Sequence, residues 1–347
     1  YISVTGVQTC ALPIYRAGRA GISTGSPRVF CVRVASGVVG ALACTVAQPQ
    51  SWPMKAVRVI VPMAAGGGSD SVARIMSAKL GDALGQQFVV DNRGGGGGLI
   101  GIGMAVKAAP DGYTLMLISG SVPATIAAHK PPYDAIGGLS GVIRVGYSPL
   151  TLVVHPSIPP KTAKELIAFV RERPGQLSFV VPGVGSLTHL AMEYLMSLTQ
   201  MRMLHVPYKS TGLGMTDLLS GQTQVMMTGM LPVLPYVQAG RLRAVAVSTA
   251  QRWPAQKAIP ALSETVPGFD VESWFAFVAP KGMPSAVIAR LNGEMNKMFQ
   301  DADLRKTLDA QGMAVAGGTA EDVERRMRVE HDRWAKILRE SNIKIQG

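Results

Sequence analysis

The stretch Val59–Met76, VIVPMAAGGGSDSVARIM, places three consecutive glycines between an apolar run and a helical pattern. Val59–Val61 has the composition of a buried strand, and Val72 and Ile75 then recur at helical spacing. The glycines Gly66–Gly68 therefore mark the turn from a strand into the N-terminus of a helix. Such a turn exposes unpaired N–H groups at the positive end of a helix dipole, and glycine lets a ligand approach the backbone closely. The pattern predicts an anion-binding site.

The order of strand, glycine-rich turn and helix recurs along the chain. Repetition of this unit favours an α/β fold with a parallel sheet. We expect Thr162 to cap one helix, and we expect the last helix to begin at Thr319. Further strands are expected at 88–92, 113–119, 150–156, 177–181, 203–207, 242–249 and 273–280, and further helices at 100–109, 163–173, 186–198, 211–219, 285–299 and 302–312.

The charge of the chain does not indicate a nucleic-acid partner. The 347 residues are 47% hydrophobic and 16% charged, with a formal net charge of +12. Four arginines precede residue 48, where there is no acidic residue, so the rest of the chain carries +12 − 4 = +8. Its lysines and arginines are scattered, without a basic run or interleaved aromatic residues. A mildly basic globular protein that meets small anions fits this composition better.

The first 47 residues contain two segments that we exclude from the fold. Residues 1–14 include VTGVQTCALPI, which resembles a translated sequencing adapter, and we interpret them as an artefact rather than a genuine leader. Residues 15–47 end in the uncharged stretch Val34–Ala47, which follows Arg28 and Arg33. We interpret residues 15–47 as a secretory signal peptide that is cleaved near Gln48, because a membrane span would need about 20 apolar residues.

Two other interpretations of residues 15–47 stay open: a buried helix of the mature domain, and a lipid anchor at Cys44. With export, the three cysteines, Cys10, Cys31 and Cys44, all precede the cleavage site, so the mature periplasmic protein has no thiol and no disulfide.

Three glycine turns before helices are the candidate binding elements: Gly66–Asp70, Gly183–Ser186 and Ser210–Gly212. Ligands of open α/β sheets bind beyond the carboxyl ends of the strands, where such turns lie. Two domains that present these turns to each other would hold an anion without a metal or other cofactor. A nucleotide-binding loop does not fit, since its lysine is missing, and we expect Asp70 to cap its own helix.

Ser186 and His189 could instead form the nucleophile and base of a hydrolase. No G-x-S-x-G elbow surrounds Ser186, so we expect His189 to serve as a packing residue or a neutral donor.

Eight motifs in order resemble one receptor family. They are RVIVPMAAGGGSDSVARIMSAKL, LGQQFVVDNRGGGGGLIG, AAPDGYTLML, GVGSLTHLAMEYL, HVPYK, TDLLSGQ, AGRLRAVAV and PGFDVESWFAFVAPKGMP. From about Trp52 to the C-terminus the chain resembles the Bug-type extracytoplasmic solute receptors of tripartite tricarboxylate transporters.

The resemblance implies a type II periplasmic binding protein, in which two α/β domains close over a ligand like a Venus flytrap. Domain 1 would comprise residues 52–152 and 275–347, and domain 2 residues 153–274. The implied partners are a small organic carboxylate and the membrane components of the transporter, with the receptor a monomer and not an enzyme. The implied ligand-binding residues, including one position where the family usually has Asp, are Ala65, Gly66, Gly67, Ser69, Asp70, Gly183, Gly185, Ser186, His189, Tyr208, Lys209 and Thr228.

This sequence departs from the family pattern at several of these positions. Thr228 replaces the usual Asp, Val180–Pro182 replaces Gly-Ser-Ala, and Ser210 replaces a glycine. We therefore expect a carboxylate that carries no amine, with an apolar or aromatic body against Val181 and Pro182. A sensor domain that feeds a signalling partner would share the fold and stays open as an alternative.

Overall fold

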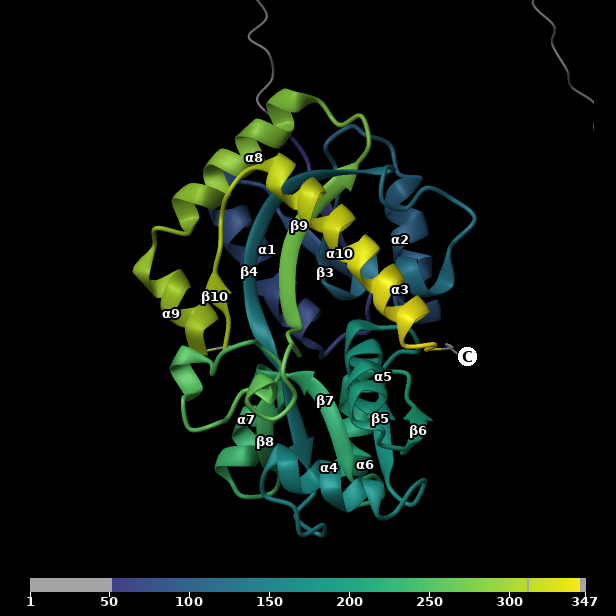
Figure 1. Ribbon diagram of the computed structural model, residues 1–347. Coiled ribbons are helices and arrows are strands. Elements are labelled where there is room, and N and C mark those ends of the chain that lie inside the picture. Colours follow the sequence, from purple (N-terminus) through teal and green to yellow (C-terminus); the bar gives the residue numbers. More distant parts are fainter. Residues whose placement is uncertain (1–51, 311, 344–347) are drawn as a thin grey trace, which may run out of the picture. The chain divides into compact units, whose positions relative to one another are not determined.

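The computed structural model describes residues 52–310 and 312–343, which belong to one compact unit, Pro49–Gly347 (Figure 1). The predictions for residues 1–14 and 15–47 lie outside the described residues. The strands are β1 (Val57–Val61), β2 (Phe88–Asn92), β3 (Thr114–Ser119), β4 (Leu139–Val154), β5 (Ser178–Val181), β6 (Leu204–Pro207), β7 (Val225–Gly229), β8 (Arg243–Val247), β9 (Glu272–Pro280) and β10 (Ala314–Val315).

The helices alternate with the strands. They are α1 (Gly68–Leu84), α2 (Leu99–Val106), α3 (Ser121–His129), α4 (Ala163–Arg171), α5 (Leu187–Thr199), α6 (Thr211–Leu219), α7 (Met230–Gln238), α8 (Ser285–Met298), α9 (Ala302–Ala310) and α10 (Ala320–Glu340). The Thr162 hydroxyl accepts from Glu165 N–H, so the predicted cap at Thr162 is confirmed. The last helix was expected to begin at Thr319, which is the N-cap residue of α10: its hydroxyl accepts from Asp322 N–H.

The strands form a mixed sheet in the order β2-β1-β3-β9-β4-β7-β5-β6, with β8 and β10 both paired to β4. The pairs of β1 with β2 and β3, and of β5 with β6 and β7, are parallel. All strands that pair with β4 or β9 are antiparallel to them. The expected parallel pairing is thus present among the repeated strand-turn-helix units, and the two long strands β4 and β9 add antiparallel pairs to it.

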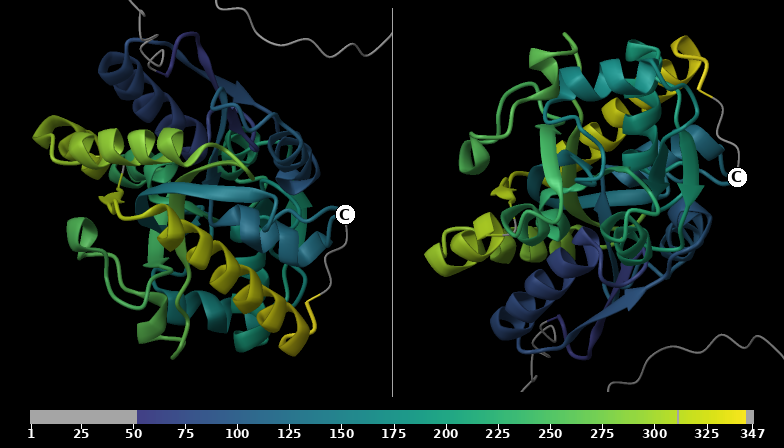
Figure 2. Two further views of the ribbon diagram at one scale, coloured as in Figure 1. Left: turned by 90° about the horizontal axis from the view of Figure 1, so that it is seen from above. Right: turned by 90° about the horizontal axis from the view of Figure 1, so that it is seen from below.

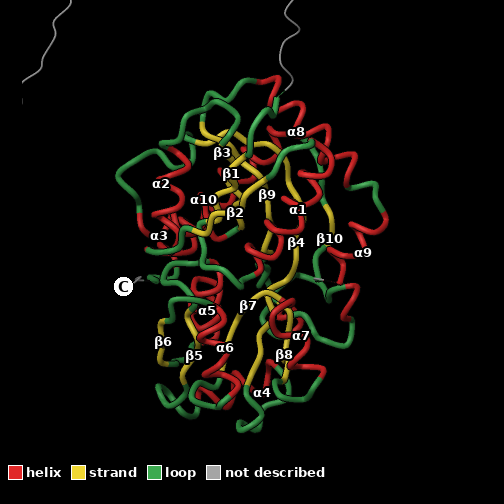
Figure 3. The backbone as a smooth tube through the Cα atoms, turned by 180° about the vertical axis from the view of Figure 1, so that it is seen from behind, coloured by secondary structure: helices red, strands yellow, loops and turns green. Residues whose placement is uncertain are grey.

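Strand β4 connects two groups of strands (Figures 1 and 3). Its residues Leu139–Pro149 pair with β9 in the first strand group, which we define as β1, β2, β3, β9 and β10. Its residues Leu150–Val154 pair with β7 in the second strand group, which we define as β5–β8. The sixteen residues of β4 thus carry the chain from one group into the other, while the domain boundaries at 152 and 275 stay a prediction.

Both faces of the first strand group are covered by helices, as a parallel arrangement requires. Val57, Val59 and Val61 of β1 pack with α1, α8 and α9, whereas Ile60 packs with α2 and α10. Viewed from above, α1 and α10 lie on opposite sides of β4 (Figure 2). These strands are consequently apolar on both faces, which explains the continuous hydrophobic runs in the sequence.

Helix α3 packs into two cores, because Val122 and Ile126 join the core of the first strand group while its alanines face α5. Ala124 and Ala127 share a core with Leu187 and Leu190 of α5 and with Trp334 of α10. Among residues 52–310 and 312–343, no helix combines the length and the apolar character that crossing a membrane requires.

Candidate functional site

A small cavity of about 100 Å³ lies where the loop after β1 faces the loops before α5 and α6. Three of the predicted site residues line it: Gly67, Ser69 and Lys209. The other lining residues come from the carboxyl end of β3, the start of α3, the start of β9 and the same loops. They are Met63, Ala64, Gly68, Ser119, Ser121, Pro182, Thr188, Ser210, Thr211, Ser273 and Phe275.

A larger groove of about 980 Å³ lies between α1 and the edge strand β2. Its walls are the side of α1, with Arg74 and Asp82, and the strand residues Phe88–Val90. No helix N-terminus faces this groove from its lining residues, so it lacks the feature that the sequence singled out. The smaller cavity is the better candidate for an anion.

The turn before α1 is built by Gly66 and Asp70. Gly66 has φ +83°, which L side chains rarely adopt, so this is the position that requires glycine. Gly67 is the N-cap residue with φ −95° and ψ 174°, a conformation open to any residue. Gly66 and Ala65 are exposed and do not line the cavity.

Asp70 is committed to this turn rather than to a ligand. Its Oδ2 accepts from Gly66 N–H at 3.0 Å and from Arg74 Nε at 3.1 Å, and its side chain is almost fully buried. Burial alone raises the pKa of Asp70, but the hydrogen bonds from Arg74 and Gly66 outweigh it and hold that pKa below its ordinary value. The carboxylate is therefore ionised and neutralised by Arg74. It does not cap α1 as expected, because its backbone partner is the N–H of Gly66, which precedes the N-cap residue Gly67.

The turn Gly183–Ser186 has most of its backbone groups paired within the protein. Ser186 N–H donates to Gly183 O at 3.0 Å, and Gly185 N–H donates to His189 Nδ1 at 3.0 Å. Leu187 N–H donates to Ser121 Oγ at 3.3 Å. These N–H groups are not free for a carboxylate, and this turn meets the cavity through Pro182 and Thr188 instead.

The geometry does not support a hydrolase at Ser186 and His189. The Ser186 hydroxyl lies 3.1 Å from Thr188 Oγ1, and His189 Nδ1 already accepts the Gly185 N–H. Ser186 and His189 are 1% and 2% exposed, and neither lines the cavity. A base that is occupied and a nucleophile that is enclosed cannot act on a bound ester.

The turn before α6 contributes one charge and two hydroxyls to the cavity. Lys209 is exposed, and the Ser210 hydroxyl caps α6 by accepting from Leu213 N–H at 3.3 Å. A Cβ on Gly67 would lie 3.9 Å from Thr211 Oγ1, so the turns before α1 and α6 nearly touch across the cavity.

Tyr208 and Thr228, which were predicted to bind the ligand, do not line the cavity. The Tyr208 hydroxyl donates to Asp217 Oδ2 at 2.7 Å, and burial followed by this bond raises its pKa to about 12. Thr228 is 3% exposed, pairs with Thr151 across β7 and β4, and is not among the residues that line the cavity. Val181 is fully buried, so of the two residues expected to meet an apolar ligand body only Pro182 lines the cavity.

Hydroxyl groups dominate the polar lining of the cavity. The sequence analysis missed most of them, because several come from β3, α3 and β9, which meet only through long-range strand pairing. A serine at the carboxyl end of a parallel strand, Ser119, was the one available signal. The seven lining hydroxyls belong to Ser69, Ser119, Ser121, Thr188, Ser210, Thr211 and Ser273.

The electrostatics of this cavity suit an anion. Residues from the first turns of α1, α3, α5 and α6 line it, and each such helix end carries a partial positive charge. Among the described residues that line it, Lys209 is the single charged side chain and none is acidic. Across residues 52–310 and 312–343 there is no cluster of three or more His, Cys, Asp or Glu side chains arranged to hold a metal ion.

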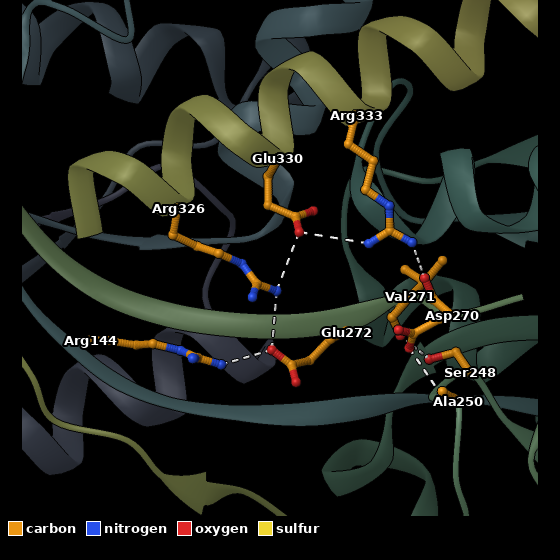
Figure 4. Close-up of polar contacts among 9 residues, drawn as sticks. All are labelled: Arg144, Ser248, Ala250, Asp270, Val271, Glu272, Arg326, Glu330 and Arg333. Atoms are coloured by element: carbon orange, nitrogen blue, oxygen red, sulfur yellow. Dashed lines mark hydrogen bonds and ion pairs between the residues drawn. The ribbon is translucent and has the colours of Figure 1, made fainter. Parts of the chain in front are cut away.

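Ion pairs surround Glu272, the first residue of β9 and the neighbour of the lining residue Ser273 (Figure 4). Glu272 Oε1 lies 2.7 Å from Arg144 Nη2 and 3.2 Å from Arg326 Nη2 of α10. Burial raises the pKa of Glu272 more than these two arginines lower it.

The ion pairs of Figure 4 continue along α10 and end at Asp270, shortly before β9. Glu330 lies 3.2 Å from Arg326 and 3.7 Å from Arg333, and Arg333 donates to the carbonyl of Asp270. The C-terminal helix thus fixes the segment Asp270–Glu272, where the chain returns from the second strand group to the cavity.

Comparison with known proteins shows to which family the chain belongs. A model of the tripartite tricarboxylate transporter family receptor matches residues 72–343. The chain is 34% identical over 300 residues to protein BugT of Bordetella pertussis, which covers 85% of this chain and 92% of BugT. This chain belongs to that receptor family. The receptor is therefore a solute-binding protein and not an enzyme.

Solved structures agree with this receptor's fold. BugD, a periplasmic binding protein, is 29% identical with a TM-score of 0.80, over 85% of this chain and all of BugD. An R. palustris protein solved with adipate is 32% identical with a TM-score of 0.81, over 85% of this chain and 99% of that protein. MatC from Rhodopseudomonas palustris, with bound malate, is 27% identical with a TM-score of 0.78, over 83% of this chain and all of MatC.

Proposed function

We propose that this receptor captures a small organic carboxylate that carries no ammonium group, in the cavity that Gly67, Lys209 and Thr211 line. The observation that carries the proposal is the lining itself, which combines one lysine and seven hydroxyls with no acidic side chain. Four helix N-termini add partial positive charge at the same place. A carboxylate that accepts several charge-assisted hydrogen bonds, each contributing about 1.5–3 kcal/mol, can reach micromolar affinity after the costs of binding.

The same lining disfavours an amino acid. An ammonium group that leaves water needs an anion or several acceptors, and each unpaired one costs free energy. Asp70 is the acidic residue nearest in sequence to the lining turn, and Gly66 and Arg74 occupy its carboxylate. We therefore expect discrimination against amine-bearing ligands.

The body of the ligand is short and polar rather than aromatic. Val181 is enclosed, and the apolar lining is limited to Met63, Ala64, Pro182 and Phe275, among seven hydroxyls. This revises the expectation of an apolar or aromatic body and favours a short dicarboxylate or hydroxy acid. The malate of MatC has such a body, and the longer adipate of the R. palustris protein shares with it two carboxylates and the absence of an amine.

The wider role follows from the family. We propose that the mature receptor starts near Gln48 in the periplasm, closes its two domains on the ligand, and delivers it as a monomer to the membrane components of a tripartite tricarboxylate transporter. The approach of Gly67 to Thr211 and the passage of β4 between the strand groups support closure.

Isothermal titration with malate and aspartate tests the proposal most sharply, because the two share a skeleton and differ by a hydroxyl in place of an ammonium. We expect malate to bind at least about tenfold more tightly, which corresponds to about 1.4 kcal/mol. Succinate and adipate serve to find the best chain length. Tighter binding of aspartate than of malate would show that the cavity provides an acceptor for the amine and would overturn this ligand class.

A further inference from the structure

Gly185, in the turn before α5, lies between His189 of α5 and His129 of α3. It is buried with φ +76°, and a Cβ at this position would overlap the His129 ring. His189 contacts the same residue from α5, where its ring is 2% exposed. His189, which was predicted to bind the ligand, thus contacts the turn Gly183–Ser186 and does not line the cavity.

The hydrogen bond from Gly185 determines the tautomer of His189. The Gly185 N–H lies 3.0 Å from His189 Nδ1, and a backbone N–H can only donate. Nδ1 is therefore the acceptor, so the neutral ring carries its proton on Nε2, which lies 3.5 Å from Glu193 Oε1. His189 is an acceptor for the turn, and its buried ring agrees with the packing role, one of the two roles expected for it.

Helix α3 holds the same turn with donors. His129 Nε2 lies 3.2 Å from the Val184 carbonyl, and a carbonyl can only accept, so His129 donates. The Thr125 hydroxyl donates to Gly185 O at 3.1 Å. The N–H of Gly185 is thus bound by His189 of α5, and its carbonyl is bound by Thr125 of α3. Helix α3 is also the helix that lines the cavity at Ser121.

From this geometry we infer that His189 is a positioning residue for the proposed carboxylate site: its Nδ1 orients the Gly185 peptide and thereby places Pro182 and Thr188 against the ligand. Without an acceptor the buried Gly185 N–H would be unpaired, and the turn would rotate to find another partner. Rotation would displace the turn that joins Pro182 and Thr188, which lie three residues before and three residues after Gly185 and line the cavity. The inference rests on the proposed function.

The test compares side chains that differ in where they place an acceptor. In His189→Asn, Oδ1 occupies nearly the position of Nδ1 and can accept the Gly185 N–H, whereas His189→Leu has no acceptor. We expect His189→Leu to weaken malate binding at least about tenfold in titration calorimetry and His189→Asn to stay within about threefold of wild type. His205→Leu is the matched control: its ring lies 6.0 Å from that of His189, it is exposed and it does not line the cavity.

Each outcome bears on the inference. Wild-type affinity in a folded His189→Leu protein, or equal losses in the Leu and Asn variants, would overturn it. Should His189→Leu fail to fold, His189→Gln replaces it, because its acceptor lies at the position of Nε2 and not of Nδ1; wild-type affinity in that variant would overturn the inference. Absence of malate, succinate and adipate binding by the wild type would instead refute the proposed function, so the two failures are distinguishable.

Discussion

Gly66 and Gly67 are neighbours with different physical roles, so substituting each one separates folding from binding. At Gly66 the constraint is the backbone, because φ is +83° and no atom lies within 4 Å of an added Cβ. A left-handed conformation costs an L residue about 1–2 kcal/mol, so Gly66→Ala should lower Tm by roughly 2–8 °C. Gly66 does not line the cavity, so malate affinity should change less than about threefold.

At Gly67 the constraint is space. Its φ of −95° suits valine, so Gly67→Val should fold with nearly wild-type Tm. A Cβ there already lies 3.9 Å from Thr211 Oγ1, and the γ-carbons extend about 1.5 Å further, inside contact distance. In the closed, ligand-bound arrangement this overpacking costs about 1–3 kcal/mol, whereas the ligand-free protein avoids it by opening, so Tm without ligand is kept and malate affinity falls roughly 5- to 150-fold.

Circular dichroism melts and titration calorimetry on both variants check this pair. The two variants should differ in opposite ways. Gly66→Ala should be less stable but bind malate, and Gly67→Val should be stable but bind malate more weakly. Wild-type affinity in Gly67→Val would place the site away from the turn before α1 and refute the reasoning.

Three further predictions concern charge and hydrogen bonding. Lys209→Met should weaken malate binding by about 1 kcal/mol, roughly fivefold, and Lys209→Arg should not; an effect that persists undiminished in high salt would contradict a role for an exposed charge. Because the pKa of Asp70 is lowered in the folded protein, its contribution to stability is present above the ordinary aspartate pKa of about 3.9 and is lost as pH falls through the lower folded value. The Tm difference between wild type and Asp70→Asn should therefore hold near neutral pH and narrow below about pH 3.9, and a difference that widens in acid would refute the assignment. Tyr208→Phe removes the bond to Asp217 and should cost about 0.5–1.5 kcal/mol in denaturant unfolding while malate affinity stays constant; a large loss of affinity would place Tyr208 at the ligand.

Much of the fold could be predicted from local patterns, because β1, β3 and β5 are largely buried strands with mostly apolar sequences. The caps at Thr162 and Thr319 were predictable for a similar reason, since side-chain capping is a local interaction. Helix α3 was missed because Val122–Ala127 is buried and carries Pro123, so it shows no amphipathic pattern. Helix α7 carries Pro235 in its interior and was missed as well.

The candidate site was predictable only in part. Gly67, Ser69 and Lys209 lie where a strand passes through a turn into a helix, and ligands of α/β sheets bind at such positions, so the sequence pattern identified them. Ser273 lines the same cavity through the antiparallel pairing of β9, which no local pattern encodes. His189 shows the converse: sequence proximity to a binding turn cannot distinguish a ligand contact from a side chain that supports the turn.

The central claim is that the cavity binds a small carboxylate without an amine, and mass spectrometry of the natural ligand tests it most directly. The receptor is purified rapidly without added ligand and denatured, and the released small molecules are identified, with Gly67→Val treated in parallel as the control. The account predicts a short carboxylic acid, with no ammonium group, that is released by the wild type and depleted from the variant. Release of an amino acid or a phosphate ester by the wild type, or equal amounts of the same acid from both proteins, would contradict it.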